Sequence, residues 1–166
     1  TDYDDWAALG NEGWSYEDVL PYFIKSESNQ VIKNHPLHGN DGPLTVEKHR
    51  TVNVLSDVFV DAAQDVGHKK NDDFNAHEQE GVGRYQVTQR NGERCSSAKA
   101  YLTPVLSRGN LPIISAAQAT RVLFDGQQAI GVEYSKDGSL SRAEIGRQGE
   151  VILSGGALQS PQLLLL

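Results

Sequence analysis

The chain has 166 residues, which is enough for one domain with a sizeable core. Acidic residues outnumber basic ones by 22 to 15, giving a formal charge of −7, and this balance argues against nucleic acid as a partner. The hydrophobic fraction of 38% indicates a globular chain in water, and no apolar run reaches the ~20 residues that a transmembrane segment needs.

Short helices are predicted for the first 28 residues. Asp2 or Asp4 can cap a first helical turn. Ser15 and Asp18 are spaced as a capping box at the start of a second helix, with Asp in place of the usual Glu or Gln. Pro21 lies inside the apolar pattern of this second helix and is expected to kink it or to split it in two.

Loops and one clear helix fill the next part of the chain. Residues 29–42 are polar, end in HGNDGP and predict a loop that leads into a short strand, Leu44–Glu47. Val52–Val66 predicts a helix because its apolar residues recur on one face at helical spacing. Lys69–Glu80 predicts a long charged loop, of the kind that often borders a functional site.

A strand with polar residues on both faces is predicted for Val82–Gln89. It is either an exposed antiparallel strand or a sheet face that lines a polar pocket. Arg90–Glu93 then predicts a turn. After it, Ser96 or Ser97 caps a short helix that runs through Leu102.

From Leu111 onward the sequence predicts β-structure. Four strand candidates follow one another, and the turns Asp125-Gly126 and Asp137-Gly138 connect the later three into an antiparallel meander. The candidates are Leu111–Ser115, Ala119–Phe124, Ile130–Ser135 and Leu140–Ile145.

The closing segment, Glu150–Leu166, predicts a buried strand that turns into a helix. Val151–Leu153 is an apolar run, and Gly155-Gly156 follows it. Such turns favour nucleotide phosphates, because free N–H groups converge there and no side chain blocks approach. Four leucines end the chain without a cap, so we expect the chain to be an internal piece of a longer protein.

The histidines do not indicate a metal site. His35, His38 and His77 have no cysteine or carboxylate partners at ligand spacing, so they are predicted to be surface residues and no metal is predicted. His49 and His68 are likewise expected to be exposed.

Other reactive side chains also favour structural roles. Cys95 has no base near it in the sequence, so a nucleophilic role is not favoured. As a lone cysteine it forms no internal disulfide, which is consistent with the cytoplasm. The acidic residues of the long loop predict a solvated surface rather than an acid–base pair: Asp72, Asp73, Glu78 and Glu80.

Four stretches, in order along the chain, resemble the glucose–methanol–choline (GMC) oxidoreductases, and the choline dehydrogenase-like branch in particular. They read DYDDWAALGNEGWSYEDVLPYF, GNDGPL, EGVGRYQVTQRNGERCSSAKAYLTP and GGALQSPQLL. The last is the most specific, because it follows the family's second signature. The resemblance implies a parent flavoenzyme that moves a hydride from a primary alcohol carbon to FAD.

The resemblance also implies that the chemistry lies elsewhere in that parent. The GxGxxG turn for the FAD pyrophosphate is expected upstream, and the catalytic His with its partner is expected downstream. No catalytic residue is therefore assigned to this chain, and the isolated chain is expected to be inactive and to bind FAD weakly. In the parent, a cytoplasmic location or the periphery of the inner membrane is expected.

Two segments resemble cofactor contacts of the family, and one resembles its substrate pocket. Val122 matches the strand residue whose backbone meets the FAD adenine. Ser154, Gly155, Gly156 and Ala157 match the turn beside the ADP half of FAD, where the family usually has Ala at the position of Gly155. The stretch 82–89 resembles the sheet that faces the flavin ring, which makes Tyr85 and Gln86 candidate contacts of a small alcohol.

The expected fold class is α+β, within a parent of α/β type. Residues 1–108 are expected to hold helices and part of a substrate-binding domain, and residues 109–166 part of an FAD-binding domain with its meander, buried strand and first helical turns. The alternative is a folded, non-catalytic module that self-associates through the apolar surface exposed by truncation of the parent chain. A small nucleotide-binding protein is less favoured, because the sequence has no phosphate loop.

Overall fold

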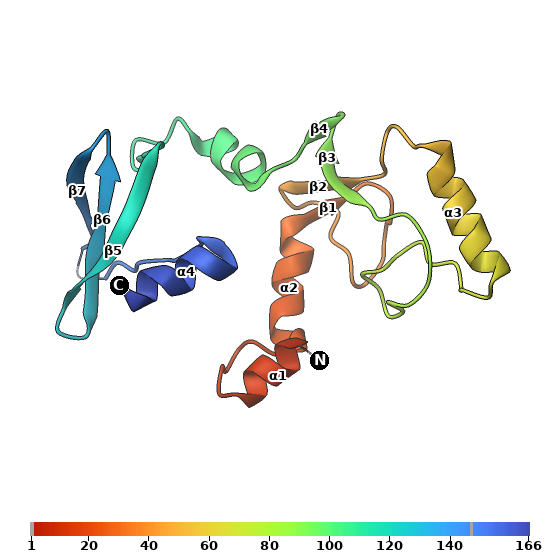
Figure 1. The fold of residues 1–166 in the computed structure, drawn as a ribbon, viewed down its shortest axis with the longest axis horizontal. Helices are drawn as coiled ribbons and strands as arrows, with labels where there is room; N and C mark the ends of the chain where they lie inside the picture. The colour runs from red at the N-terminus through yellow and green to blue at the C-terminus, as the bar shows by residue number, and fades with distance from the viewer. Residues whose placement is uncertain (1, 147) are drawn as a thin grey trace. The chain divides into compact units, whose positions relative to one another are not determined.

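The computed structural model describes residues 2–146 and 148–166, and the chain divides into two compact units, Thr1–Gly109 and Asn110–Leu166. Each unit combines a β-sheet with helices (Figure 1). The predicted α+β class is therefore confirmed.

Two helices open the first unit: α1 (Asp2–Ala8) and α2 (Tyr16–Ser26). The Asp18 N–H donates to Ser15 Oγ at 3.3 Å, and the Ser15 N–H donates to the Asp18 carboxylate at 3.2 Å, so the predicted capping box is confirmed. Pro21 lies inside α2, and the helix runs through it, so the predicted split is wrong. A proline removes only one N–H from the helix ladder, and the capped first turn keeps the helix in register.

A four-stranded sheet follows, in the order β1-β2-β3-β4. Strand β1 is parallel to β2, and the other two pairings are antiparallel. The strands are β1 (Glu27–Asn29), β2 (Leu44–Glu47), β3 (Val87–Arg90) and β4 (Glu93–Arg94).

Two sequence predictions about this sheet need correction. Strand β1 was not expected, because three residues that continue directly from a helix show no alternation of their own. The predicted strand 82–89 exists only from Val87 onward, because β2 pairs only with Val87 and Thr88. The turn between β3 and β4 is confirmed, with positive φ at both Asn91 and Gly92 as a type I′ turn requires.

The predicted helix in the middle of the chain is α3 (Val54–Asp65). Asn53 caps it, since its side-chain oxygen accepts the Leu55 N–H at 2.9 Å. The apolar face that predicted this helix is largely exposed, with Leu55 at 68% and Phe59 at 69% of full exposure. The helix forms as expected, but its apolar face is not part of a core.

A short helical stretch ends the first unit. Ala98–Leu102 forms one π-helical turn, and Thr103–Val105 a 3₁₀ turn. Ser96 Oγ accepts the Lys99 N–H at 3.2 Å, which agrees with its predicted role at the start of this stretch.

The second unit is an antiparallel meander with one helix. Strands β5 (Ala117–Asp125), β6 (Gln128–Lys136) and β7 (Ser139–Glu144) pair in order, as predicted. Helix α4 (Gly156–Leu165) follows, also as predicted.

The predicted strands at both edges of this meander are wrong. Residues 111–115 and 151–153 are not assigned to any strand and have no strand partners among the described residues. A strand exists only where a neighbour accepts and donates its hydrogen bonds, so apolar composition alone does not make one.

Little apolar surface is enclosed. Among the described residues, Cys95 and Ala100 are the apolar residues that are fully buried, and both lie in the first unit. No helix in 2–146 or 148–166 combines the length and the apolar character that crossing a bilayer requires.

Candidate functional site

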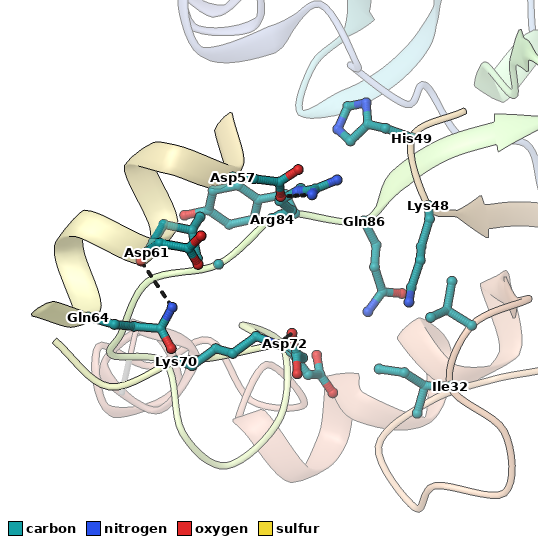
Figure 2. Close-up of a pocket in the computed structure, with 15 residues that line it drawn as sticks. Ile32, Lys48, His49, Asp57, Asp61, Gln64, Lys70, Asp72, Arg84 and Gln86 are labelled. Carbon is teal, nitrogen blue, oxygen red and sulfur yellow. Dashed lines mark hydrogen bonds and ion pairs between the residues drawn. The ribbon is translucent and has the colours of Figure 1, made fainter. Parts of the chain in front are cut away.

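Four of the seven predicted site residues line two hollows, one in each unit. Tyr85 and Gln86 line a cavity of about 650 Å³ in the first unit, shown in Figure 2. Ser154 and Gly155 line a groove of about 680 Å³ in the second unit.

The walls of the first cavity are polar and carry both signs of charge. Helix α3 contributes Asp57 and Asp61, and the segment after β2 contributes Lys48 and His49 (Figure 2). The side chain of Arg84 forms an ion pair with Asp57. Because opposite charges meet at its walls, the cavity suits a small polar molecule.

One side of this cavity is aromatic. The Tyr85 ring packs against the Phe74 ring with centroids 4.7 Å apart and planes at 35°. Tyr85 is nevertheless 67% exposed, because the rest of its ring faces the cavity and solvent. Tyr85 therefore offers an apolar face beside the charged groups.

The amide of Gln86 has a fixed orientation. Asn29 Oδ1 accepts the N–H groups of Val31 and Ile32 at 2.9 and 2.8 Å, which determines which atom of the Asn29 amide is nitrogen. Asn29 Nδ2 then donates to Gln86 Oε1 at 2.8 Å. Since its oxygen is the acceptor, Gln86 keeps its Nε2 amino group as a hydrogen-bond donor at the cavity wall.

His38 is buried, so the prediction of a surface histidine is wrong. Only 7% of the residue is exposed. Its Nδ1 lies 2.9 Å from Glu27 Oε2 and its Nε2 lies 2.9 Å from Asp73 Oδ2. Burial on its own lowers the pKa of His38, but hydrogen bonds to Asp73 and Glu27 and their charges outweigh it, so the pKa lies above 6.5.

Asp73 likewise differs from its prediction as part of a solvated loop. Its carboxylate binds His38 and also accepts the Asn75 N–H at 3.0 Å. The residue lines the first cavity. The long loop 69–80 is thus attached to the sheet by a buried ion pair that sequence spacing did not reveal.

The other four histidines are exposed or half-buried. His49, His68 and His77 are exposed, and His35 is half-buried. Within the described part of the chain, no group of three or more His, Cys, Asp or Glu side chains is arranged to hold a metal ion. Cys95 is buried at 1% exposure, with Sγ 3.9 Å from the Pro43 carbonyl oxygen.

The groove of the second unit lies between the meander and α4. Thr120 in β5 and Val132 in β6 line one side, and Ser154 and Gly155 line the other. Val122 lies two residues beyond Thr120 and pairs with Val132. Strand β5 is an edge of its sheet, so its outer backbone groups have no strand partner among the described residues.

The turn into α4 fits the expected contact with a nucleotide. Ser154–Ala157 is exposed, and Gly156 has φ +84 with no atom within 4 Å of an added Cβ. The N–H groups of a first helical turn have no partners within the helix, so they can meet an anion. The Gly155 N–H is an exception, because it donates to Ser160 Oγ at 2.9 Å. An anionic group such as a phosphate can therefore approach the backbone of this turn.

Comparison with known proteins identifies the family. The family model of the GMC oxidoreductases matches residues 1–166. The chain belongs to the GMC oxidoreductases. Over 165 residues it is 46% identical to mitochondrial choline dehydrogenase of Mus musculus and 44% identical to alcohol dehydrogenase [acceptor] of Pseudomonas putida, in each case over 99% of this chain.

Solved structures agree with this family membership. An FAD-dependent oxidoreductase from Chaetomium thermophilum matches 86% of the chain at a TM-score of 0.75 and 30% identity. The pyridoxine 4-oxidase from "Mesorbium loti" matches the same share of this GMC chain at a TM-score of 0.75 and 25% identity. The chain spans only 27–30% of the length of the two curated relatives and 27–28% of these two structures.

Sequence reasoning missed the buried cluster of Glu27, Asn29, His38 and Asp73. The only local signal was His38 directly before Gly39 in a polar turn. The partners of His38 lie 11 and 35 residues away, so no spacing rule connects them.

Proposed function

We propose that this chain supplies part of the substrate pocket and part of the FAD-binding surface of an enzyme that oxidises the CH–OH group of a primary alcohol. The family match over the whole chain carries the proposal. The names of two relatives, choline dehydrogenase and alcohol dehydrogenase [acceptor], support the substrate class. FAD, when bound, accepts the hydride from the alcohol carbon.

The residues of the first cavity bind and orient the alcohol. Gln86 donates an N–H from Nε2 to the alcohol oxygen, because its own oxygen is occupied by Asn29. Tyr85, packed on Phe74, covers the carbon side of the substrate and excludes water. We assign no base to this chain, so the proton of the alcohol leaves to a group outside it.

The predicted cofactor residues of the second unit, of which Ser154 and Gly155 line the groove, hold the cofactor. The Val122 backbone, on an edge strand, meets the adenine, and Ser154–Ala157 approaches the ADP phosphates and ribose. These roles follow from the family resemblance, and the exposed turn at Gly156 supports them.

The test is flavin reduction by alcohols in the protein as its gene encodes it. Under anaerobic conditions, a primary alcohol should bleach the visible absorbance of the bound flavin. Gln86→Ala and Tyr85→Ala should each raise the KM for that alcohol by about tenfold, as expected for a lost hydrogen bond or packing contact. Gln127→Ala, in the exposed turn between β5 and β6, is the control. Unbleached flavin with a full panel of primary alcohols would reject the proposal.

A second candidate is a folded module without catalysis that self-associates. The exposed apolar side chains favour it, with Phe59 at 69% and Leu165 at 88% exposure. Sedimentation of the 166-residue chain decides this candidate, because a single monomeric species at all concentrations would rule it out.

A further inference from the structure

A buried cluster of polar side chains joins three distant segments of the first unit. Glu27 comes from β1, His38 from the loop after β1, and Asp73 from the loop 69–80. Asn29, at 0% exposure, is the fourth member. A fully satisfied polar cluster of this kind holds its segments in one arrangement.

The cluster reaches the first cavity at two points. Asp73 lines the cavity and binds His38 Nε2. On the other side, Glu27 Oε1 accepts an N–H of Asn29 at 2.9 Å, and the same Asn29 amide holds Gln86 at 2.8 Å. Two walls of the cavity are thus connected through His38.

We propose that His38 is a positioning residue of this cavity: held as an imidazolium between two carboxylates, it fixes Asp73 on one wall and, through Glu27 and Asn29, the Gln86 amide on another. The proposal rests on the proposed function, since Gln86 is there a contact of the alcohol.

The geometry favours the charged form of His38 when both carboxylates are ionised. Each ring nitrogen lies 2.9 Å from a carboxylate oxygen, so both contacts are hydrogen bonds only when both nitrogens carry a proton. In a neutral ring, the lone pair of one nitrogen would face a carboxylate oxygen, and the two would repel each other. The titratable or charged groups that face the ring are Glu27 from β1, Asp73 from the loop 69–80, and His35 from its own loop, with ring centroids 5.4 Å apart.

The raised pKa of His38 gives this arrangement a pH limit. The charged ring is present at and below pH 6.5 and is lost as pH rises through the higher pKa of the folded protein. As pH rises through that pKa, Asp73 and Gln86 lose their common anchor. The KM for the alcohol is therefore expected to rise in that window, while kcat changes little.

The kinetic test is His38→Gln in the complete FAD-loaded protein. The variant keeps a hydrogen-bond donor but carries no charge. We expect a KM about tenfold higher at pH 6.5 and below, a kcat within about twofold, and loss of the rise in KM with pH. Asp73→Asn, which keeps an acceptor for His38, should show the same direction of change. The control is His68→Gln, an exposed histidine after α3, which should match the wild type.

A second readout does not use activity. A glutamate-specific protease cuts after Glu78 and Glu80, both exposed in the loop that Asp73 attaches. We expect His38→Gln to speed these cuts relative to the cut after the exposed Glu12, and the wild-type loop to be cut faster as pH rises.

The outcomes separate the alternatives. Wild-type KM and wild-type cleavage in both His38→Gln and Asp73→Asn would overturn the inference. A second result would also overturn the inference: kcat and FAD content fall equally in the variants, while the KM of the remaining holoenzyme is unchanged. That result would show that His38 has a purely structural role. If the wild-type protein oxidises no alcohol, the proposed function fails, and the cleavage of the loop still decides whether His38 anchors it.

Discussion

Gly39 and Gly42 lie where one segment of backbone passes directly over another. A Cβ on Gly39 would come 1.8 Å from the Ile24 carbonyl oxygen, and one on Gly42 would come 2.3 Å from the Ser26 carbonyl carbon. The same crossing carries a backbone hydrogen bond, since the Gly42 N–H donates to the backbone carbonyl oxygen of Glu27 at 2.8 Å. The glycines of HGNDGP are therefore required by the contact between this loop and the end of α2.

This close approach predicts a large effect for a small change. Gly39→Ala or Gly42→Ala should lower the free energy of unfolding by about 3 kcal/mol or more, because backbone rather than a side chain must move. Gly109→Ala is the matched control, since nothing lies within 4 Å of an added Cβ there. Denaturant unfolding measures the difference, and equal stability of all three variants would contradict the crossing.

The lowered pKa of Glu133 leads to a second prediction at the scale of one residue. Hydrogen bonds from Arg121, at 3.1 Å to each carboxylate oxygen, lower the pKa of Glu133 below its ordinary 4.5. Its stabilising contribution is therefore present above pH 4.5 and is lost as pH falls through the lowered pKa. Glu133→Gln should make the amide hydrogen exchange of β5 and β6 less sensitive to acid. The same acid sensitivity in the variant and the wild type would argue against the ion pair.

At the scale of the elements, the backbone conformation at the start of α4 allows a test of the proposed cofactor contact. Gly156 has φ +84, a region that costs a residue with a Cβ about 1 kcal/mol, whereas Gly155 has φ −79 and is free of this strain. Gly156→Ala should lower stability by about that amount and weaken FAD binding. We expect Gly155→Ala to have a smaller effect on both, although its Cβ would come within 3.1 Å of Gln159 Cβ.

Two measurements check the comparison at α4. Fluorescence titration of the apoprotein with FAD gives the affinity, and thermal unfolding gives the stability. If Gly156→Ala binds FAD as tightly as Gly155→Ala, the Ser154–Ala157 turn is not a cofactor contact.

At the scale of the whole molecule, the described chain exposes far more apolar surface than it encloses. Cys95 and Ala100 are its fully buried apolar residues, whereas the apolar face of α3 and the leucines of α4 are largely exposed. Hydrophobic burial is the main favourable contribution to folding, so these 166 residues alone enclose little of the apolar surface that stabilises a domain of this length.

The last prediction concerns the 166-residue chain expressed on its own. It should be colourless after purification with FAD and should bind a hydrophobic dye such as ANS, because its apolar faces are open and its sequence has no GxGxxG turn. The protein as its gene encodes it should be yellow and bind much less dye. A stoichiometric yellow complex of the 166-residue chain would contradict the expected weak FAD binding.

Local sequence determined most of the elements. The capping box of Ser15 and Asp18, the helix Val54–Asp65 and the hairpin turns all depend on neighbouring residues, so sequence patterns predicted them. The family, too, could be read from the sequence, since its motifs follow in order along the chain.

Only the tertiary structure decided which extended segments are strands and which polar residues are buried. Residues 111–115 and 151–153 look like strands but find no partners among the described residues, whereas β1, predicted as the end of a helix and the first residue of a loop, pairs with β2. His38 looks like a surface residue and is enclosed between two carboxylates. Strand pairing and the burial of charge depend on groups that are distant in the sequence, and local spacing carries no record of those contacts.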